Sequence, residues 1–196
     1  MISSIVLAAG FSTRMGSPKA LLDWGGQTLL GYDVEQLRAA GVDEVIVVVG
    51  HRSDDVRRAI RRSDCRVMNN PAYHTGRSGS LRLGAKAVNR DADAIIVANV
   101  DQPRPADFYR ELIASFDPAS AATLPEFEGH HGHPVIVAGR LREELMAANE
   151  ESRGLAGVLR NHASELTSYQ STDLCLLDIN TPEEYRQARE RLGAPV

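Results

Sequence analysis

The chain has 196 residues, a net charge of −4 and a pI of about 5.9, so it is mildly acidic. This balance argues against bulk electrostatic binding to nucleic acid or to an anionic membrane surface, and no apolar run approaches the roughly 18 residues of a membrane span. Cys65 and Cys175 stand in no metal-binding spacing, and residues 1–4 carry no basic leader segment, so we expect a single cytoplasmic domain over residues 1–196 with two reduced thiols.

The first predicted element is a buried strand, the apolar run from Ile5 to Ala9, and a polar loop follows it as far as Lys19. Gly10 and Gly16 bound this loop, and glycine lets backbone N–H groups approach a ligand because it has no Cβ. Arg14 and Lys19 add two cations that suit a polyphosphate. The spacing is neither that of a Walker A loop nor that of a dinucleotide-binding loop. From these residues alone, an ordinary strand–turn–helix connection therefore remains open.

After this loop, predicted helices and strands alternate along the chain. Continuously apolar, β-branched strands are typical of a parallel sheet that is covered by helices on both faces. The last helix has a predicted capping box formed by Thr181 and Glu184, with Pro182 at its first position. The predicted helices cover residues 28–40, 54–62 (capped by Ser53), 78–88, 105–115, 139–148 and 182–192, and the later strands cover 45–49, 66–68, 94–101, 121–124, 132–137 and 174–179.

Two of these elements present polar groups where a ligand could bind. The strand over 94–101 ends in Asp101, and ligands of open α/β sheets bind beyond the carboxyl ends of the strands. A carboxylate there suits a Mg²⁺ ion that bridges phosphate oxygens, although it could instead cap the next helix. The Gly/Ser-rich segment from Thr75 to Leu81 opens a helix and can present N–H groups and hydroxyls to an anion or a base edge. In that segment, Ser78 could also act as a simple helix cap.

The segment LAAGFSTRMGSPKALL resembles the opening signature of the MobA-like nucleotidyltransferases, LAAG-x-S-x-R-M-G-x-x-K-x-L-L, and is most similar to the MocA-type branch, the molybdenum cofactor cytidylyltransferases. The resemblance extends through VDQP, GHHGHPV and LDINTPEEY. It implies a three-layer α/β/α, Rossmann-like and GT-A-like fold, with a mostly parallel sheet and one antiparallel strand. It also implies transfer of a nucleotidyl group from an NTP to a phosphorylated acceptor, with Mg²⁺ or Mn²⁺ and release of pyrophosphate.

The resemblance assigns roles to individual residues. Arg14 would neutralise the departing phosphates, Lys19 would stabilise charge on the α-phosphate, and Asp101 would bind the metal. Asn180 would complete the metal site, and Asp178 would coordinate through water or orient Lys19. The Asn69-Asn70-Pro71 segment also allows a plain turn. The nucleotide contacts that the resemblance implies are Leu7, Ala8, Ala9, Gly10, Ser12, Arg14, Met15, Gly16, Lys19, Asn70, Ser78, Ser80, Asp101 and His133.

The resemblance also bears on which nucleotide and which acceptor are used. Ala9 and Gln102 follow the cytidylyl branch rather than the guanylyl pattern of LAGG and DMP, which favours CTP. The N-terminal half would bind this nucleotide and the C-terminal half would bind molybdopterin. However, Ser152 and Ala156 replace the Asp and Arg of the MocA-type pattern G-D-x-G-A-R. A different phosphorylated acceptor, such as a sugar or polyol phosphate, therefore stays open, with Arg153 or Arg160 as a replacement cation.

The expected partners are small molecules, namely the NTP and the acceptor, together with a transient contact to a molybdoenzyme. Neither nucleic acid nor a membrane is expected. A non-catalytic nucleotide-binding factor for molybdoenzyme maturation is the alternative from a different class. The presence of Arg14, Lys19 and Asp101 together argues against it, because a protein that only binds nucleotide would be expected to have lost at least one of them.

Overall fold

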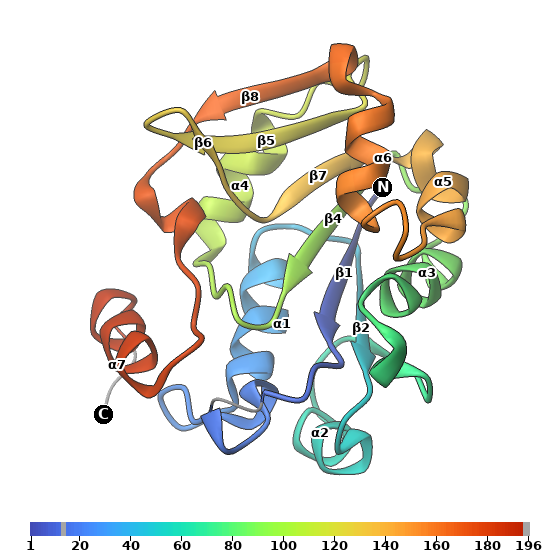
Figure 1. Ribbon diagram of the computed structural model, residues 1–196. Helices are drawn as coiled ribbons and strands as arrows, with labels where there is room; N and C mark the ends of the chain where they lie inside the picture. Colours follow the sequence, from blue (N-terminus) through green and yellow to red (C-terminus); the bar gives the residue numbers. More distant parts are fainter. Residues whose placement is uncertain (13–14, 194–196) are drawn as a thin grey trace.

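The structure is a computed structural model that describes residues 1–12 and 15–193. Within these residues, eight strands form one sheet that helices cover on both faces (Figure 1). The strands are β1 (Ile2–Ala8), β2 (Glu44–Val49), β3 (Arg66–Asn69), β4 (Ala94–Asn99), β5 (Ala122–Phe127), β6 (His130–His131), β7 (Val135–Ala138) and β8 (Leu166–Gln170). The helices are α1 (Leu29–Ala39), α2 (Ser53–Ala59), α3 (Ser78–Ala87), α4 (Ala106–Ala114), α5 (Arg142–Ala147), α6 (Leu155–Asn161) and α7 (Pro182–Arg191).

The sheet has the order β3-β2-β1-β4-β7-β5, with β8 and the two-residue β6 both paired to β5. Strands β1 to β4 are parallel to one another, and β7 runs antiparallel to both β4 and β5. Strand β8 is parallel to β5, and β6 adds a short antiparallel pairing. The mostly parallel sheet with its antiparallel strand β7 confirms the predicted fold class.

Alternate residues of the central strands pack into two separate cores, one on each face of the sheet. Val6 and Val47 face the core that α1, α2, α4 and α7 cover, whereas Ile5 and Val48 face the core under α3, α5 and α6 (Figure 1). This alternation explains the continuous apolar sequences, because both faces of each strand are buried. Helix α3 lies so close to β1 that a Cβ on Gly84 would come within 2.4 Å of Ile5. The three-layer arrangement is therefore the one that the strand patterns predict.

Residues 174–179 do not form the predicted strand. Asp173–Leu176 form a short 3-10 segment, η6, and the extended chain after it pairs with no strand among the described residues. The guanidinium of Arg104, which is fully buried, donates to the carbonyl oxygens of Cys175 and Leu177 at 3.1 Å. These acceptors are thus satisfied by a side chain instead of a neighbouring strand. The last strand is β8, whose polar sequence LTSYQ carries no buried-strand pattern.

Three local predictions also differ from the structure. Ser53 does not cap α2, because the helix follows Arg52, which is left-handed with a φ of 51°, and it ends at Ala59. The strand predicted over 121–124 is longer, since β5 extends to Phe127 and pairs with β6 across a turn of two positive-φ residues, Glu128 and Gly129. The strand predicted over 132–137 begins only at Val135. Both cysteines are free thiols, and Cys175 is buried whereas Cys65 is only half-buried.

Candidate active site

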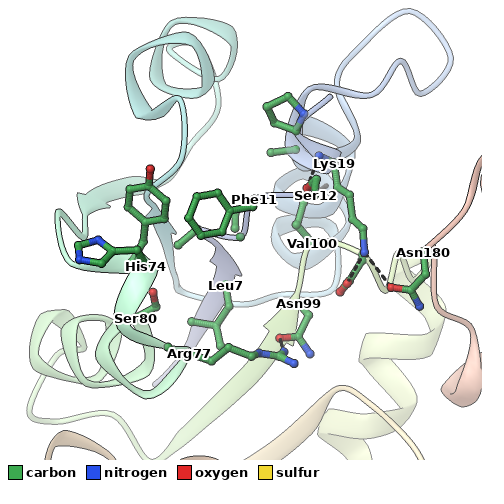
Figure 2. Close-up of a pocket in the computed structure, with 18 residues that line it drawn as sticks. Leu7, Phe11, Ser12, Lys19, His74, Arg77, Ser80, Asn99, Val100 and Asn180 are labelled. Carbon is green, nitrogen blue, oxygen red and sulfur yellow. Dashed lines mark hydrogen bonds and ion pairs between the residues drawn. The ribbon is translucent and has the colours of Figure 1, made fainter. Parts of the chain in front are cut away.

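A cavity of about 520 Å³ opens at the carboxyl ends of β1 and β4, where the predicted loop after β1 meets the strand-end Asp101. Figure 2 shows its side chains converging from several elements. This is the position at which open α/β sheets bind ligands. The lining residues are Leu7, Ala8, Ala9, Gly10, Phe11, Ser12, Pro18, Lys19, Ala20, Tyr73, His74, Gly76, Arg77, Ser80, Asn99, Val100, Asp101 and Asn180.

Lys19 connects the loop to two oxygen-bearing side chains. Its Nζ lies 2.8 Å from Oδ2 of Asp101 and 3.0 Å from Oδ1 of Asn180, as the dashed lines in Figure 2 mark. Its backbone N–H donates to Oγ of Ser12 at 3.0 Å, so the loop conformation holds the base of the side chain in place. The Lys19 side chain is only 12% exposed. Three predicted site residues that are far apart in the sequence therefore meet at one point.

Backbone contacts bring Asp101 and Asn180 together. The N–H of Ile179 donates to the carbonyl oxygen of Asp101 at 2.8 Å, which anchors the segment before α7 to the end of β4. The predicted capping box of α7 is present, and Oε2 of Glu184 also accepts from the N–H of Asn180 at 2.8 Å. The cap that begins α7 therefore also fixes the backbone from which the Asn180 side chain extends.

The donor set at this point suits a hard divalent cation. A carboxylate oxygen of Asp101 and an amide oxygen of Asn180 already converge on one positive charge, the Lys19 ammonium. Mg²⁺ is usually held by one or two protein oxygens together with substrate phosphates and water. Among the described residues, no group of three or more His, Cys, Asp or Glu side chains could hold a metal ion. The residues thus fit a metal that arrives with a phosphate ligand.

Among the described residues, Asp178 contacts Gln102 and forms no ion pair with Lys19, so its predicted roles in metal coordination or in orienting Lys19 stay predictions. Its Oδ1 accepts from Nε2 of Gln102 at 2.6 Å, and Oε1 of Gln102 accepts from Nδ2 of Asn99 at 2.7 Å. Oδ1 of Asn99 in turn accepts from Nη2 of Arg77 at 2.7 Å. Asp178 therefore ends a chain of hydrogen bonds that runs across the end of β4.

The structure divides the predicted nucleotide contacts into groups. Eight line the first cavity, namely Leu7, Ala8, Ala9, Gly10, Ser12, Lys19, Ser80 and Asp101, whereas Ser78 and His133 line a second cavity. Met15 packs against the hydrophobic core, and neither it nor Gly16, with a φ of 68°, lines a cavity. Arg14 lies outside the described residues.

Asn70 is a structural residue in this conformation. It is 6% exposed, its Nδ2 donates to Oγ of Ser80 at 2.9 Å, and its Oδ1 accepts from the N–H of Ala72 at 3.0 Å. The second contact forms the Asn-Pro turn that the sequence left open. Asn70 thus holds Ser80 in the wall of the cavity. Ser78 is not the helix cap, because α3 follows Arg77 and has no side-chain cap.

Sequence reasoning missed an aromatic wall. The ring of Phe11 packs 5.0 Å from that of Tyr73 and 5.4 Å from that of His51, which brings together the loop after β1, the end of β2 and the 3-10 segment η3 (Tyr73–Thr75). Phe11 is 47% exposed and lines the cavity (Figure 2). The available signal was a lone aromatic residue between Gly10 and Ser12 in a loop of small and cationic residues.

A second cavity of about 330 Å³ adjoins the first and shares Leu7, Arg77 and Asn99 with it. Its other lining residues are Ser78, Leu81, Val97, His133, Glu150, Arg153, Gly154 and Leu155. Ser152 does not line it, because the serine forms a local turn with Asn149 through contacts of 2.8 Å and 3.1 Å. Ala156 and Arg160 do not line it either, whereas Arg153 does.

His133 lines the second cavity, and its surroundings favour the neutral form of the ring. Burial lowers the pKa of this imidazole, and the cations Arg104 and Arg77 lower it further, whereas Asp178 opposes them. Its Nδ1 is buried and has no hydrogen-bond partner among the described residues. The ring can therefore offer an uncharged donor or acceptor to a ligand.

The sequence profile of the MobA-like NTP transferase domain matches residues 4–166. This chain belongs to the MobA-like NTP transferase family. The predicted resemblance is thereby confirmed. Asn180 lies beyond the matched residues of this MobA-like domain, so its place in the site comes from the structure.

Relatives of this MobA-like chain differ in what they are described as doing. It is 27% identical to the molybdenum cofactor cytidylyltransferase of Escherichia coli, over 97% of this chain and 96% of the relative. It is 29% identical to the nicotine blue oxidoreductase of Paenarthrobacter nicotinovorans, over 81% of each. The solved structure of Rv0371C of Mycobacterium tuberculosis in complex with manganese has 27% identity and a TM-score of 0.77, covering 96% of this chain and 98% of that one. No helix of the described residues is long and apolar enough to cross a membrane.

Proposed function

We propose that this protein is a divalent-metal-dependent nucleotidyltransferase that transfers CMP from CTP to a phosphorylated acceptor of the molybdopterin class and releases pyrophosphate. The observation that carries the proposal is the meeting of Lys19, Asp101 and Asn180 in the cavity at the ends of β1 and β4. A lysine from a glycine-bounded loop next to two oxygen donors supplies what phosphoryl transfer needs, namely positioning and neutralisation of phosphate charge. Membership of the NTP transferase family supports this assignment.

Asp101 and Asn180 would hold the metal, with Mg²⁺ or Mn²⁺ as the candidates. The metal, when bound, would draw charge from the phosphate oxygens that it contacts. The manganese complex of the M. tuberculosis relative supports this choice. In the chain as described, Lys19 must leave these two oxygens for a metal to bind them. The triphosphate offers the ammonium a new anionic partner, so nucleotide and metal are expected to bind together.

The reaction needs no covalent enzyme intermediate. An oxygen of the acceptor phosphate attacks the α-phosphorus of the NTP in line with the bridging oxygen to the β-phosphate. The bond from the α-phosphorus to that bridging oxygen breaks, and pyrophosphate leaves with the electron pair. The loop from Gly10 to Gly16 would hold the β- and γ-phosphates with Arg14, and Lys19 would stabilise the charge on the α-phosphate.

CTP is the proposed nucleotide because Ala9 lines the first cavity, where its methyl group would narrow the space for a purine base. Gln102, the other residue that follows the cytidylyl branch, does not line either cavity and instead holds Asn99 and Asp178. The base preference therefore rests on Ala9. The cytidylyltransferase relative of E. coli is consistent with it.

In this proposal, residues 1–196 act as one domain, and the second cavity receives the acceptor. The residues that line that cavity come from several segments, the first being Leu7 and the last Leu155, so acceptor contacts come from both halves of the chain. Ser152 and Ala156, which replace the Asp and Arg of the MocA-type pattern, lie outside it. This observation favours keeping a second candidate function, which is the transfer of a nucleotidyl group to a different phosphorylated acceptor such as a sugar or polyol phosphate.

The deciding experiment is pyrophosphate release with Mg²⁺ and each of the four NTPs, with and without molybdopterin. Release with CTP that depends on the pterin is the expected result. Release that depends on a sugar or polyol phosphate instead would select the second candidate. Tight CTP binding without release under any acceptor would reject the catalytic proposal and favour an accessory factor that binds nucleotide and contacts a molybdoenzyme.

A further inference from the structure

Arg77 occupies the boundary between the two cavities. It lines both of them, and of the three residues that do so it is the one with a charged side chain. It stands directly before α3, and its side chain extends to Asn99 at the end of β4, with Leu7 beside it (Figure 2). Lys19 approaches from the other side of the first cavity. A cation is thus placed where ligands in the two cavities would come closest.

The direction of the Arg77 guanidinium is fixed by its neighbours. Asn99 is 9% exposed, and its amide donates to Gln102, so its oxygen faces Arg77 and accepts from Nη2 at 2.7 Å. Gln102 is held in turn by Asp178 at 2.6 Å. The contact with Asn99 is the one hydrogen bond that the Arg77 guanidinium makes within residues 1–12 and 15–193. Because a guanidinium has five N–H donors, the others can bind an anion.

The residues that line the second cavity indicate which kind of ligand it can bind. Its apolar wall is formed by Leu7, Leu81, Val97 and Leu155. Arg77 and Arg153 contribute positive charge, while the carboxylate of Glu150 accepts from the N–H of Ser78 at 2.5 Å. The charged lining residues therefore have a net positive balance. A compact apolar body that carries an anionic group complements such a surface, and arginine prefers phosphate or carboxylate oxygens.

We propose that Arg77 binds the nucleophilic phosphate of the acceptor and holds it against the α-phosphate of the NTP, so that the second cavity selects phosphate monoesters with a compact apolar body. This inference rests on the proposed function. Two phosphates repel each other as they approach, and a cation between them lowers that repulsion. Arg77 thus joins Lys19 as a charge at the reacting atoms, but it acts on the acceptor.

The test measures the binding of phenyl phosphate, a compact apolar body with a phosphate monoester, to the nucleotide-free protein by calorimetry or NMR. Arg77→Met should weaken this binding about tenfold or more, because a charge-assisted hydrogen bond is lost. It should change the affinity for Mg·CTP less than about threefold, since the loop and Lys19 carry that contact. Arg77→Lys keeps the charge and should lose less affinity. Arg160→Met removes a cation of α6 that lines neither cavity and should leave both affinities unchanged.

Circular dichroism establishes that each variant is folded before binding is compared. Equal affinity of the wild type and Arg77→Met for phenyl phosphate would overturn the inference. So would an equal loss for phenyl phosphate and Mg·CTP, or failure of the wild type to bind phenyl phosphate at millimolar concentration. Arg77-dependent binding of phenyl phosphate without pyrophosphate release under any acceptor would support the site while rejecting the proposed function.

Discussion

Lys19 joins the loop after β1 to the oxygens of Asp101 and Asn180 that we propose as metal ligands, so its removal is expected to separate binding from turnover. Lys19→Ala should lower turnover by roughly 10²–10³, by analogy with the loss of one donor to a developing charge. The measurement is pyrophosphate release at saturating CTP and acceptor. Lys86→Ala removes the other lysine of the chain, which is exposed on α3, and should keep full turnover. Unimpaired turnover of Lys19→Ala would remove Lys19 from the mechanism.

The same variant has a second expected effect, on the metal alone. In the wild type, a free divalent ion must displace an ammonium that lies 2.8 Å from Asp101 and 3.0 Å from Asn180. Removing this competitor should tighten Mn²⁺ binding in the absence of nucleotide by about tenfold or more, which corresponds to one charge-assisted hydrogen bond. Electron paramagnetic resonance titration of Mn²⁺ measures it without any reaction. Weaker Mn²⁺ binding by Lys19→Ala would show that the metal uses other oxygens.

Ala9 offers a test of nucleotide choice at the level of one methyl group. Ala9→Gly enlarges the first cavity, so the variant should accept GTP better relative to CTP, by up to about tenfold in kcat/KM, as is typical for one methyl group in a pocket. Competition between the two nucleotides in pyrophosphate release gives the ratio directly. A ratio that favours CTP as strongly as before would mean that other groups discriminate between the bases.

The residues of the site differ in how well the sequence predicts them. Lys19 and Asp101 are predictable, because a glycine-bounded loop and a strand-end carboxylate are local patterns. Asn180 came from the family resemblance alone, and its contact with Lys19 depends on an anchor between Ile179 and Asp101 that no local pattern encodes. Arg77 gave no signal, since nothing in its neighbourhood shows that α3 begins beside the end of β4.

At the scale of elements, the strand predicted over residues 174–179 is wrong for a physical reason that lies in Arg104. The apolar sequence predicted a strand, yet the segment is held by a buried guanidinium that donates to the carbonyl oxygens of Pro103, His133, Cys175 and Leu177. Strand prediction assumes that backbone acceptors pair with another strand. Arg104, 71 residues before Cys175, donates to them instead, and β8 takes the sheet edge with a polar sequence.

Arg104→Met is therefore expected to be severely destabilising. It removes a donor from each of these carbonyl oxygens, of which that of Cys175 keeps the N–H of His133, and it also removes a cation near the buried carboxyl of Asp33. The expected loss is about 3–5 kcal/mol in the free energy of unfolding, because the carbonyl oxygens of Pro103, His133 and Leu177 lose this donor at about 1–3 kcal/mol for each group left unsatisfied. Urea unfolding followed by circular dichroism measures it.

The matched control is Arg186→Met, because Arg186 makes an exposed ion pair with Glu183 within α7. This variant should lose less than about 1 kcal/mol in the free energy of unfolding. A similar small loss for Arg104→Met would mean that the segment 174–179 is held by its apolar side chains rather than by the guanidinium.

At the scale of the whole molecule, Asp33 links stability to pH. This residue of α1 is 2% exposed, and neither carboxylate oxygen has a hydrogen-bond partner among the described residues. Burial raises the pKa of the carboxyl well above its ordinary value, and Asp101 raises it further, while Arg104 opposes both. The folded protein therefore holds a proton on Asp33 at pH values where the unfolded chain has released it.

The direction of the pH dependence follows from this difference. Below the ordinary aspartate pKa of about 3.9, both states are protonated and the contribution of Asp33 to stability is fully present. As the pH rises towards the folded pKa, the unfolded chain gains an ionised state that the folded one lacks. Stability then falls by about 1.4 kcal/mol per pH unit from this group alone.

Asp33→Asn removes the titrating group and should become progressively more stable than the wild type as the pH rises from 4 towards neutrality. Burial of the new amide adds an offset that is independent of pH, so the slope carries the test. Urea unfolding across this range measures the slope, and Asp91→Asn, at an exposed turn position, should follow the wild type. A constant difference between Asp33→Asn and the wild type would show that Asp33 is ionised in the folded protein. The charge of Arg104 would then outweigh the cost of burying the carboxylate.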